Sequence, residues 1–395
     1  MWTKYLPYHV ARIRRLRQRL LGLNWHLTAI EVASKDALYP FPETRSKGDD
    51  YICLFSGKSY RALAPHTIHT TALRTIERLH PDVVIAPATP FPSGMASVKY
   101  SLQHNKISVM MDDAWEYSDR RGAIISAVKK IIHRNIDAAF IPAQSHASYY
   151  LKMGFPSERI FYGVDTVDNE YFETSADNYR AQSAALRKVL RLPERYFLFV
   201  GRLIERKGIT TLLEAYRRYR KLPSNEKWGL VLVGEGDERK HHEETMKLFP
   251  EVQFVGSQFG DSLCRYYGLA SAFILPSEIE TWGLVVNEAM ASGLPVLISK
   301  GCGASRELVQ EGINGWTFKV GDAQELAERM AAISSLPGEQ LEHMGTLSRD
   351  IIHAMSLDTF ADSVIAASSL QRRERGGFIS YLVTKFWTGR ISFYP

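Results

Sequence analysis

Residues Ser277 to Gly293 read Ser-Glu-Ile-Glu-Thr-Trp-Gly-Leu-Val-Val-Asn-Glu-Ala-Met-Ala-Ser-Gly and carry two carboxylates, Glu280 and Glu288, on either side of a glycine. An apolar run, Ala272–Leu275, and a proline precede them, so we expect a strand, a turn, and a helix beginning near Leu284. Glu280 then lies in the loop at the strand's carboxyl end, where open α/β sheets bind ligands. Free amides at a helix start can hold phosphate, and carboxylates accept hydrogen bonds from sugar hydroxyls. A sugar nucleotide has both kinds of group.

A second motif, Gly201-Arg-Leu-Ile-Glu-Arg-Lys-Gly208, directly follows the apolar run Tyr196–Val200 and precedes a helix. Gly201 lets the backbone turn tightly and approach a ligand. Arg202 and Lys207 are expected at the strand's carboxyl end, where they would neutralise a diphosphate as its bond to a sugar breaks. Taken singly, this motif is explained as well by a basic surface turn, and the first motif by a βα unit with two surface glutamates. The combination favours a nucleotide site.

Together the two motifs resemble glycosyltransferase family 4, whose retaining enzymes have the GT-B fold and an E-x7-E motif. The likeness includes the adjoining Pro-Ser, Trp-Gly and Glu-Ala pairs, and it is specific from Phe197 to Gly315. It implies that Arg202 and Lys207 bind the donor's phosphates, Glu288 the ribose and Glu280 the transferred sugar. The remaining residues expected to line the donor site are Gly201, Gly234, Gly256, Gly283, Leu284 and Val285.

The first half of the chain offers a weaker candidate, Asp113, which follows the expected strand Lys106–Met111. The resemblance implies a polar residue near this point that touches the donor sugar or the acceptor. Asp112 and Asp113 could equally cap the next segment or bind a metal, but no His/Asp cluster with metal spacing accompanies them. We therefore expect no metal and no cofactor, the donor substrate being a UDP- or GDP-sugar. His9 is a further candidate, although a lone histidine is more often structural.

The organisation of the chain indicates two domains. Its 395 residues exceed what one core usually supports, and the alternation of strands and helices starts twice. We expect an α/β protein of the GT-B type, with two Rossmann-like domains facing a central cleft. The expected parts are an N-terminal acceptor-binding domain (1–175), a C-terminal nucleotide-sugar-binding domain (176–355), and a crossover helix with a basic aromatic tail (356–395).

Composition restricts the compartment and the partners. The three cysteines are scattered, which favours a reducing compartment and argues against structural zinc. No apolar run is long enough for a transmembrane helix, and the start lacks the apolar core of a signal peptide, so a cytoplasmic protein is expected. The net charge of +6 is concentrated in five arginines between Arg12 and Arg19 and in the tail. No nucleic-acid-binding module accompanies this charge, so nucleic acid is not an expected partner.

The tail Gly377–Gly389 has an amphipathic pattern. Phe378, Tyr381, Lys385 and Phe386 recur at helical spacing, and the flanking arginines are Arg372, Arg373, Arg375 and Arg390. Such a helix could lie in the interface of an anionic membrane, or it could dock on the first domain and bury the same apolar face in protein. The basic segment between Arg12 and Arg19 favours the membrane.

The activity expected from these features is retaining transfer of a hexose from a nucleoside diphosphate sugar to a glycan or lipid-linked acceptor, in cell-surface polysaccharide synthesis. The main alternative is a catalytically silent GT-B protein that binds a nucleotide sugar as a scaffold. Gly234 and Gly236 could begin the G-x-G-x-x-G fingerprint of a dinucleotide-binding site, but Arg239 occupies the place of its third glycine. A nicotinamide dehydrogenase is therefore disfavoured. A pyridoxal-dependent sugar phosphorylase would need a Schiff-base lysine, which the sequence does not identify.

Overall fold

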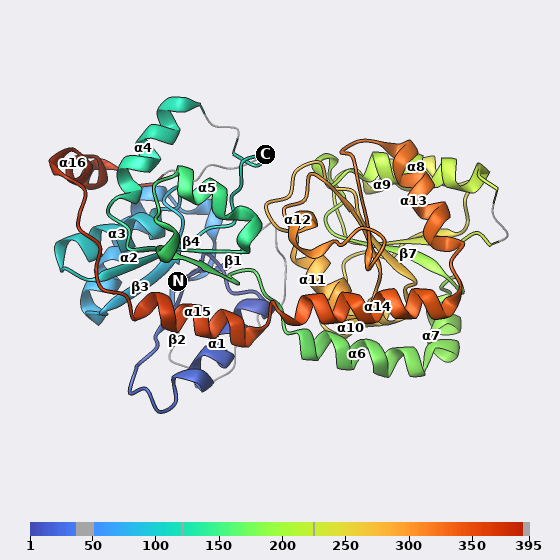
Figure 1. Ribbon diagram of the computed structural model, residues 1–395, viewed down its shortest axis with the longest axis horizontal. Coiled ribbons are helices and arrows are strands. Elements are labelled where there is room, and N and C mark those ends of the chain that lie inside the picture. Colours follow the sequence, from blue (N-terminus) through green and yellow to red (C-terminus); the bar gives the residue numbers. More distant parts are fainter. Residues whose placement is uncertain (37–50, 120–121, 224–225, 390–395) are drawn as a thin grey trace. The chain divides into compact units, whose positions relative to one another are not determined.

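The structure, a computed structural model, describes residues 1–36, 51–119, 122–223 and 226–389. The chain forms two α/β units (Figure 1): unit 1 comprises Met1–Thr166 and Leu357–Pro395, and unit 2 comprises Val167–Ser356. The chain leaves unit 1 after Thr166 and returns to it at Leu357. The boundaries expected from the sequence were 175/176 and 355/356. Every sheet in both units is parallel, which confirms the predicted α/β class with two Rossmann-like parts.

Unit 1 contains a four-stranded sheet in the order β3-β4-β5-β6 and a separate pair, β1-β2. Its strands are β1 (Ala29–Lys35), β2 (Tyr51–Ser59), β3 (Val83–Pro87), β4 (Ile107–Met111), β5 (Ala138–Ile141) and β6 (Ile160–Tyr162). Its helices are α1 (Pro7–Leu20), α2 (Pro65–Leu79), α3 (Pro92–Gln103), α4 (Ala123–His133), α5 (Ala147–Lys152), α15 (Leu357–Ser368) and α16 (Phe378–Phe386). Three of these helices begin at a proline, whose missing N–H has no intrahelical partner at that position in any case.

Two apolar layers cover the four-stranded sheet of unit 1. On one side α3, α4 and α16 pack around Met95, Met110 and Ile132. On the other side α1 and α15 pack through Leu16 and Phe360 onto β4 and β5. The carboxyl-terminal segment therefore contributes helices to both faces of the first unit's core.

The arginines of α1 are largely used within unit 1. Arg12 is 1% exposed, and its Nε and Nη2 atoms donate to the Thr166 carbonyl at 2.9 and 2.6 Å. Arg15 pairs with Asp358 at 3.4 Å and Arg19 pairs with Asp362, both on α15. Arg12, Arg15 and Arg19, which were expected to attract anionic lipid, therefore also bind groups within unit 1.

Unit 2 has one six-stranded parallel sheet in the order β12-β11-β10-β7-β8-β9. Its strands are β7 (Tyr196–Val200), β8 (Gly229–Val233), β9 (Val252–Phe254), β10 (Ala272–Leu275), β11 (Val296–Ser299) and β12 (Gly315–Phe318). Its helices are α6 (Asn169–Ala181), α7 (Ser183–Leu190), α8 (Ile209–Lys221), α9 (Arg239–Thr245), α10 (Asp261–Leu269), α11 (Leu284–Ala291), α12 (Ser305–Leu308), α13 (Ala323–Ser334) and α14 (Gly338–His353).

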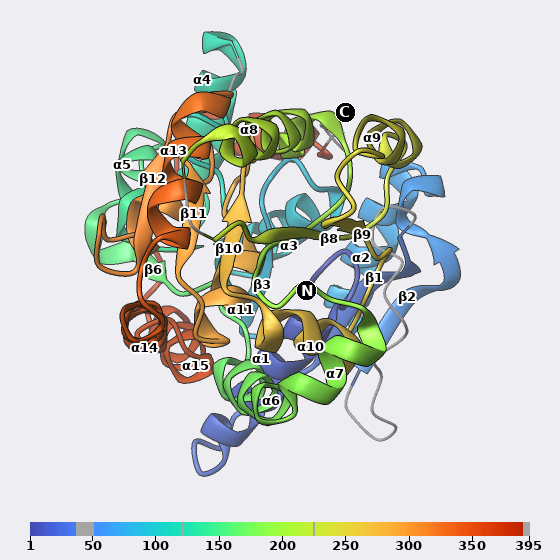
Figure 2. The same cartoon turned by 90° about the vertical axis from the view of Figure 1, so that its right-hand side faces the viewer.

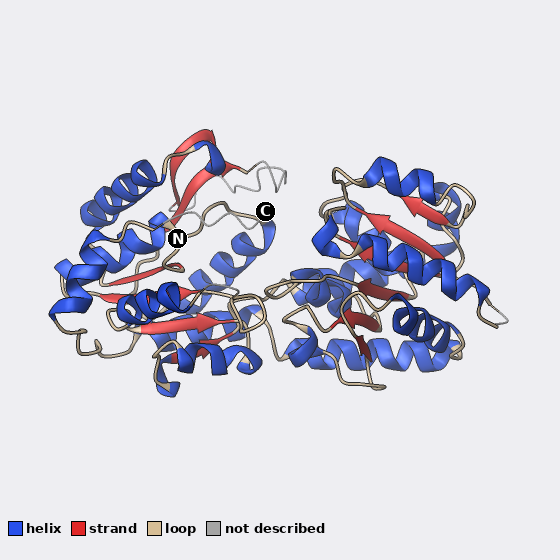
Figure 3. Cartoon of the chain, turned by 90° about the horizontal axis from the view of Figure 1, so that it is seen from above, coloured by secondary structure: helices blue, strands red, loops and turns tan. Residues whose placement is uncertain are grey.

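Helices cover both faces of this sheet (Figures 2 and 3). Helices α8 and α13 pack together on one face, and α6, α10, α11 and α14 pack on the other. The central strands are buried along their whole length, which explains their continuous apolar sequences. Strand β12 was not predicted, because its residues, Gly-Trp-Thr-Phe, lack such a run.

The strand order places a topological switch point between β7 and β10. The chain starts at β7, proceeds outward through β8 to β9, and then crosses back to β10 on the other side of β7. Loops after two such neighbouring strands diverge to opposite faces, which leaves room for a ligand between them. The loops that follow β7 and β10 are the two motifs singled out in the sequence.

Candidate functional site

The two motif loops are in direct contact at the carboxyl edge of the unit 2 sheet. Gly208 adopts φ +69°, and a Cβ atom at this position would lie 2.1 Å from the Pro276 carbonyl oxygen. The Glu278 amide donates to the Arg206 carbonyl at 2.9 Å. Glycine is required at position 208 both for its backbone angle and for the close approach. The fold thus brings together two segments about 70 residues apart, as expected for a switch point.

An ion pair between Lys207 and Glu280 lies at this junction. The two side chains are 13% and 19% exposed, and the Ser277 hydroxyl lies 3.4 Å from the same Glu280 oxygen, Oε2. The Glu280 backbone is fixed as well, because its amide donates to the Gly301 carbonyl and its carbonyl accepts from Gly303. One cation and one anion are therefore held at the sheet edge with part of their surface open to solvent.

Cys302 supports the Glu280 loop from beneath. Its thiol is fully buried and donates to the Trp282 carbonyl at 2.8 Å. A Cβ atom at Gly283 would lie 2.9 Å from the Cys302 sulfur, so glycine and cysteine fit one another here. Burial raises the pKa of Cys302 to about 12, which keeps the thiol neutral. Cys302 is thus a packing residue between Gly301 and Gly303.

The glycines after β7, β8 and β9 stack through their backbones. The Gly201 amide donates to the Val233 carbonyl at 3.0 Å, and the Gly234 amide donates to the Gly256 carbonyl at 2.9 Å. A Cβ atom at Gly234 would lie 1.8 Å from the Gly201 carbonyl oxygen. Neighbouring backbone therefore excludes a side chain at Gly234. This packing places three of the predicted glycines along one edge of the sheet.

Helix α11 presents its amino-terminal turn and Glu288 on the same edge. Gly283 precedes the helix with φ +103°, and Leu284 and Val285, both half-buried, form its first turn. The Tyr267 hydroxyl, from α10, donates to Glu288 Oε2 at 2.8 Å. Burial raises the pKa of Glu288 to about 7, although the hydrogen bond from Tyr267 opposes this rise. Glu288 is therefore poised between its acid and its carboxylate near neutral pH.

Tyr267 is a contributor that the sequence analysis missed. Its ring is fully buried and packs edge-on against Phe172, with ring centroids 6.0 Å apart. In the sequence it is one of two adjacent tyrosines in an amphipathic helix, a pattern that indicates core packing only. Its contact with Glu288 depends on how α10 and α11 pack.

The remaining predicted residues divide between the two units. Arg202 directly follows Gly201 and is half-buried in unit 2. Asp113 lies in unit 1, after β4, and it raises the pKa of Tyr150 together with Asp112, in addition to the larger effect of burial. Asp165, after β6, has a pKa raised to about 6 by burial, despite the neighbouring Arg12. Unit 1 therefore collects carboxylates at the carboxyl ends of two of its strands.

His9 has a structural role. Its ring is buried against Trp2 with centroids 4.7 Å apart, and its Nδ1 atom accepts from the Leu6 amide at 3.1 Å. Burial lowers its pKa well below the ordinary value, so the ring stays neutral. It caps the start of α1.

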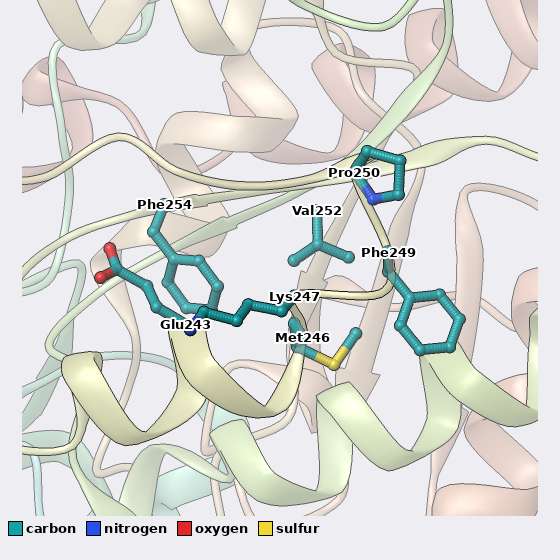
Figure 4. A pocket seen from close by; sticks show the side chains of 7 residues that line it. All are labelled: Glu243, Met246, Lys247, Phe249, Pro250, Val252 and Phe254. Atoms are coloured by element: carbon teal, nitrogen blue, oxygen red, sulfur yellow. The ribbon is translucent and has the colours of Figure 1, made fainter.

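A shallow hollow of about 270 Å³ lies where α9 meets the edge strand β9 (Figure 4). It contains none of the predicted site residues, and its lining comprises Glu243, Met246, Lys247, Phe249, Pro250, Val252 and Phe254. It is a seam between a helix and the sheet edge. Within the described ranges, no group of three or more His, Cys, Asp or Glu side chains could hold a metal ion.

Comparison with known proteins agrees with this geometry. Residues 182–350 match the family described as glycosyl transferases group 1. Sulfoquinovosyl transferase SQD2 of Arabidopsis thaliana is 28% identical over 52% of this chain and 39% of its own length. A GDP-mannose-dependent alpha-mannosyltransferase of Corynebacterium glutamicum is 28% identical over 63% of this chain and 58% of its own length. The chain thus spans roughly half the length of these curated relatives.

Solved structures resemble the chain over more of its length. The Anabaena protein Alr3699/HepE, crystallised with UDP, superposes with a TM-score of 0.66 at 19% identity, covering 81% of this chain and 86% of that one. Similarity at this identity establishes the fold. The chain has the GT-B fold, and its residues 182–350 match the group 1 glycosyltransferases.

Proposed function

We propose that this chain is a retaining glycosyltransferase of family 4. It would transfer a hexose from a UDP- or GDP-sugar to a glycan or lipid-linked acceptor in cell-surface polysaccharide synthesis, acting in the cytoplasm at the inner face of the membrane, with no metal or other cofactor. The observation that carries this proposal is the Lys207–Glu280 ion pair, held at the switch point of a parallel sheet. The GDP-mannose dependence of one relative and the UDP bound to the Anabaena protein support a nucleotide-sugar donor.

The ion pair suggests how the donor would be bound. A carboxylate accepts hydrogen bonds from sugar hydroxyls, and an ammonium neutralises phosphate, so donor binding would exchange one internal contact for two external ones. Glu280 would then hold the sugar, while Lys207 and Arg202 would hold the diphosphate. Glu288 would accept the ribose hydroxyls when it is ionised.

Catalysis would consist mainly of electrostatic stabilisation. The bond between the anomeric carbon and the diphosphate oxygen breaks, the acceptor oxygen bonds to that carbon from the same face, and the acceptor proton passes to the departing phosphate. Negative charge therefore develops on the diphosphate, where Arg202, Lys207 and the first amides of α11 are expected to lie.

The experiment that tests this function combines binding and turnover. Thermal denaturation with a panel of nucleotide sugars would identify the donor, because a ligand specific for the folded state raises its stability. With that donor, NMR of the product should give the donor's own anomeric configuration. A protein that binds the donor but neither transfers the sugar nor hydrolyses the donor would be a silent scaffold. A product with the inverted anomeric configuration would refute retention.

A further inference from the structure

Helix α16 packs against α3 and α4 with two hydroxyl side chains on its inward side. Ser380 and Thr384 are 3% and 1% exposed, and the Asn135 amide nitrogen donates to their hydroxyls at 2.8 and 2.9 Å. The Ser380 hydroxyl donates in turn to the Ile131 carbonyl at 2.6 Å. Val383 and Trp387 pack against the apolar core beside these groups, so the inward side of the segment combines hydrogen bonds with apolar contacts.

The segment before α16 is fixed in the same way. The Arg375 side chain donates to the carbonyls of Asn135 and Ser101 at 2.6 and 2.7 Å. The Arg373 amide donates to Asp137 Oδ1 at 2.8 Å, and its side chain donates to the Gly154 carbonyl. Two of the arginines expected to attract lipid therefore attach the tail to unit 1. Arg390 lies outside the described residues.

The outward side of α16 is apolar. Phe378, Ile379 and Phe386 are 75%, 70% and 76% exposed, and Tyr381 is 43% exposed. A helix docked on a protein normally buries such a face and exposes its hydroxyls. Docking on unit 1 would have been expected to bury the whole apolar face, but only Val383 and Trp387 pack on the core. Among the described residues of unit 1, the observed orientation therefore leaves Phe378, Ile379 and Phe386 largely uncovered on α16, whose ribbon is seen in Figure 1.

Most charges near this face are positive, and the exposed Glu374 just before α16 is the exception in the described part of the tail. Neither α4 nor α16 contains an aspartate or glutamate. Lys385 is exposed on α16, and Lys130 is exposed on α4. Arg134, directly after α4, is also exposed and adjoins Gly376, which precedes α16. The amino-terminal end of α4 adds the exposed side chains of Ile124 and Ile125.

We propose that α16 and the adjoining part of α4 form a docking surface for an anionic lipid bilayer. The aromatic face of α16 would enter the boundary between headgroups and acyl chains, as interfacial helices do. Lys130, Arg134 and Lys385 would pair with lipid phosphates and carboxylates. No described helix has the length and hydropathy to cross a bilayer, so binding would be to the surface. This proposal names the membrane contact assumed in the proposed function, but its test requires no donor.

The test is sedimentation of the full chain with phosphatidylcholine vesicles, with and without phosphatidylserine, at low salt. We expect binding only to the anionic vesicles. The combined variant Phe378→Ser/Ile379→Ser/Phe386→Ser should weaken binding at least about tenfold, since apolar burial at the interface is lost. Replacing Lys130, Arg134 and Lys385 by glutamine should cost about fivefold per charge.

Two matched controls lie elsewhere on the molecule. Val189→Ser/Leu248→Ser removes equally exposed apolar side chains from unit 2, and Arg14→Gln removes an exposed cation from α1. Both should bind vesicles as the parent does. Parent-like binding by the serine variant, or no binding of the parent at low salt, would overturn the proposal. It would also be overturned if the parent dimerises and the serine variant is monomeric, because the face would then cover a second copy. Unchanged nucleotide binding in either case would leave the transferase proposal intact.

Discussion

Glu288→Gln should make this protein more stable while weakening its binding of the donor. Burial raises the pKa of Glu288 from 4.5 to about 7, so the folded state binds this proton more tightly than the unfolded state does. The stability that comes from the raised pKa is complete below about pH 4.5 and is lost as the pH rises through about 7. A pKa change of this size corresponds to about 3 kcal/mol.

Glutamine removes the cost of ionisation and keeps an oxygen that can accept from Tyr267. The variant should therefore exceed the parent in unfolding free energy by up to about 3 kcal/mol near pH 8, and match it near pH 4. If Glu288 binds the ribose as proposed, donor affinity should fall, because a neutral amide accepts hydrogen bonds from hydroxyls less strongly than a carboxylate does. Such an exchange of stability for function is common at binding sites.

Urea unfolding of parent and variant at the two pH values measures the difference. The two units need not unfold in one transition, so the local stability of α11 should also be measured by amide hydrogen exchange. The reasoning is refuted if the difference between the proteins does not change with pH, or if the variant is the less stable one near pH 8.

Other substitutions test the rest of the site. Lys207→Ala should leave the fold intact and slow transfer about a hundredfold, which corresponds to about 3 kcal/mol. The control Lys247→Ala, in the hollow beside β9, should transfer at the normal rate. Equal transfer rates of the two variants would exclude Lys207 from the site. Tyr267→Phe removes a hydrogen bond to the Glu288 carboxylate and should raise the pKa of Glu288 further. The increase of nucleotide affinity with pH should therefore shift to a higher pH than in the parent, and an unchanged pH profile would contradict a positioning role. Gly208→Ala should destabilise unit 2 by at least about 1–3 kcal/mol in thermal unfolding, since the new methyl group meets the Pro276 carbonyl at a left-handed backbone angle; a variant of normal stability would show that the two loops are not held together as described.

The sequence by itself determined the local order of the donor half. Helix α11 begins at Leu284 and a helix, α8, follows the Gly201–Gly208 motif, as predicted. The glycine before each helix and the apolar strand before each loop are short-range signals. The same local signals predicted that Arg202 and Glu280 follow the carboxyl ends of strands. Strand β12 escaped prediction because an edge strand of mixed composition has no such periodic pattern.

Only the tertiary structure decided which of these groups meet. Lys207 pairs with Glu280 because β7 and β10 are neighbours, and the strand order is set by crossovers that no local pattern contains. Tyr267 reaches Glu288 through the packing of α10 and α11. The amphipathic pattern of α16 predicted a helix with an apolar face, but the hydroxyls of Ser380 and Thr384 bind Asn135, which is about 245 residues away in the chain. Partners so distant are chosen by the packed fold, because only there do the hydrogen-bonding groups lose water and require one another.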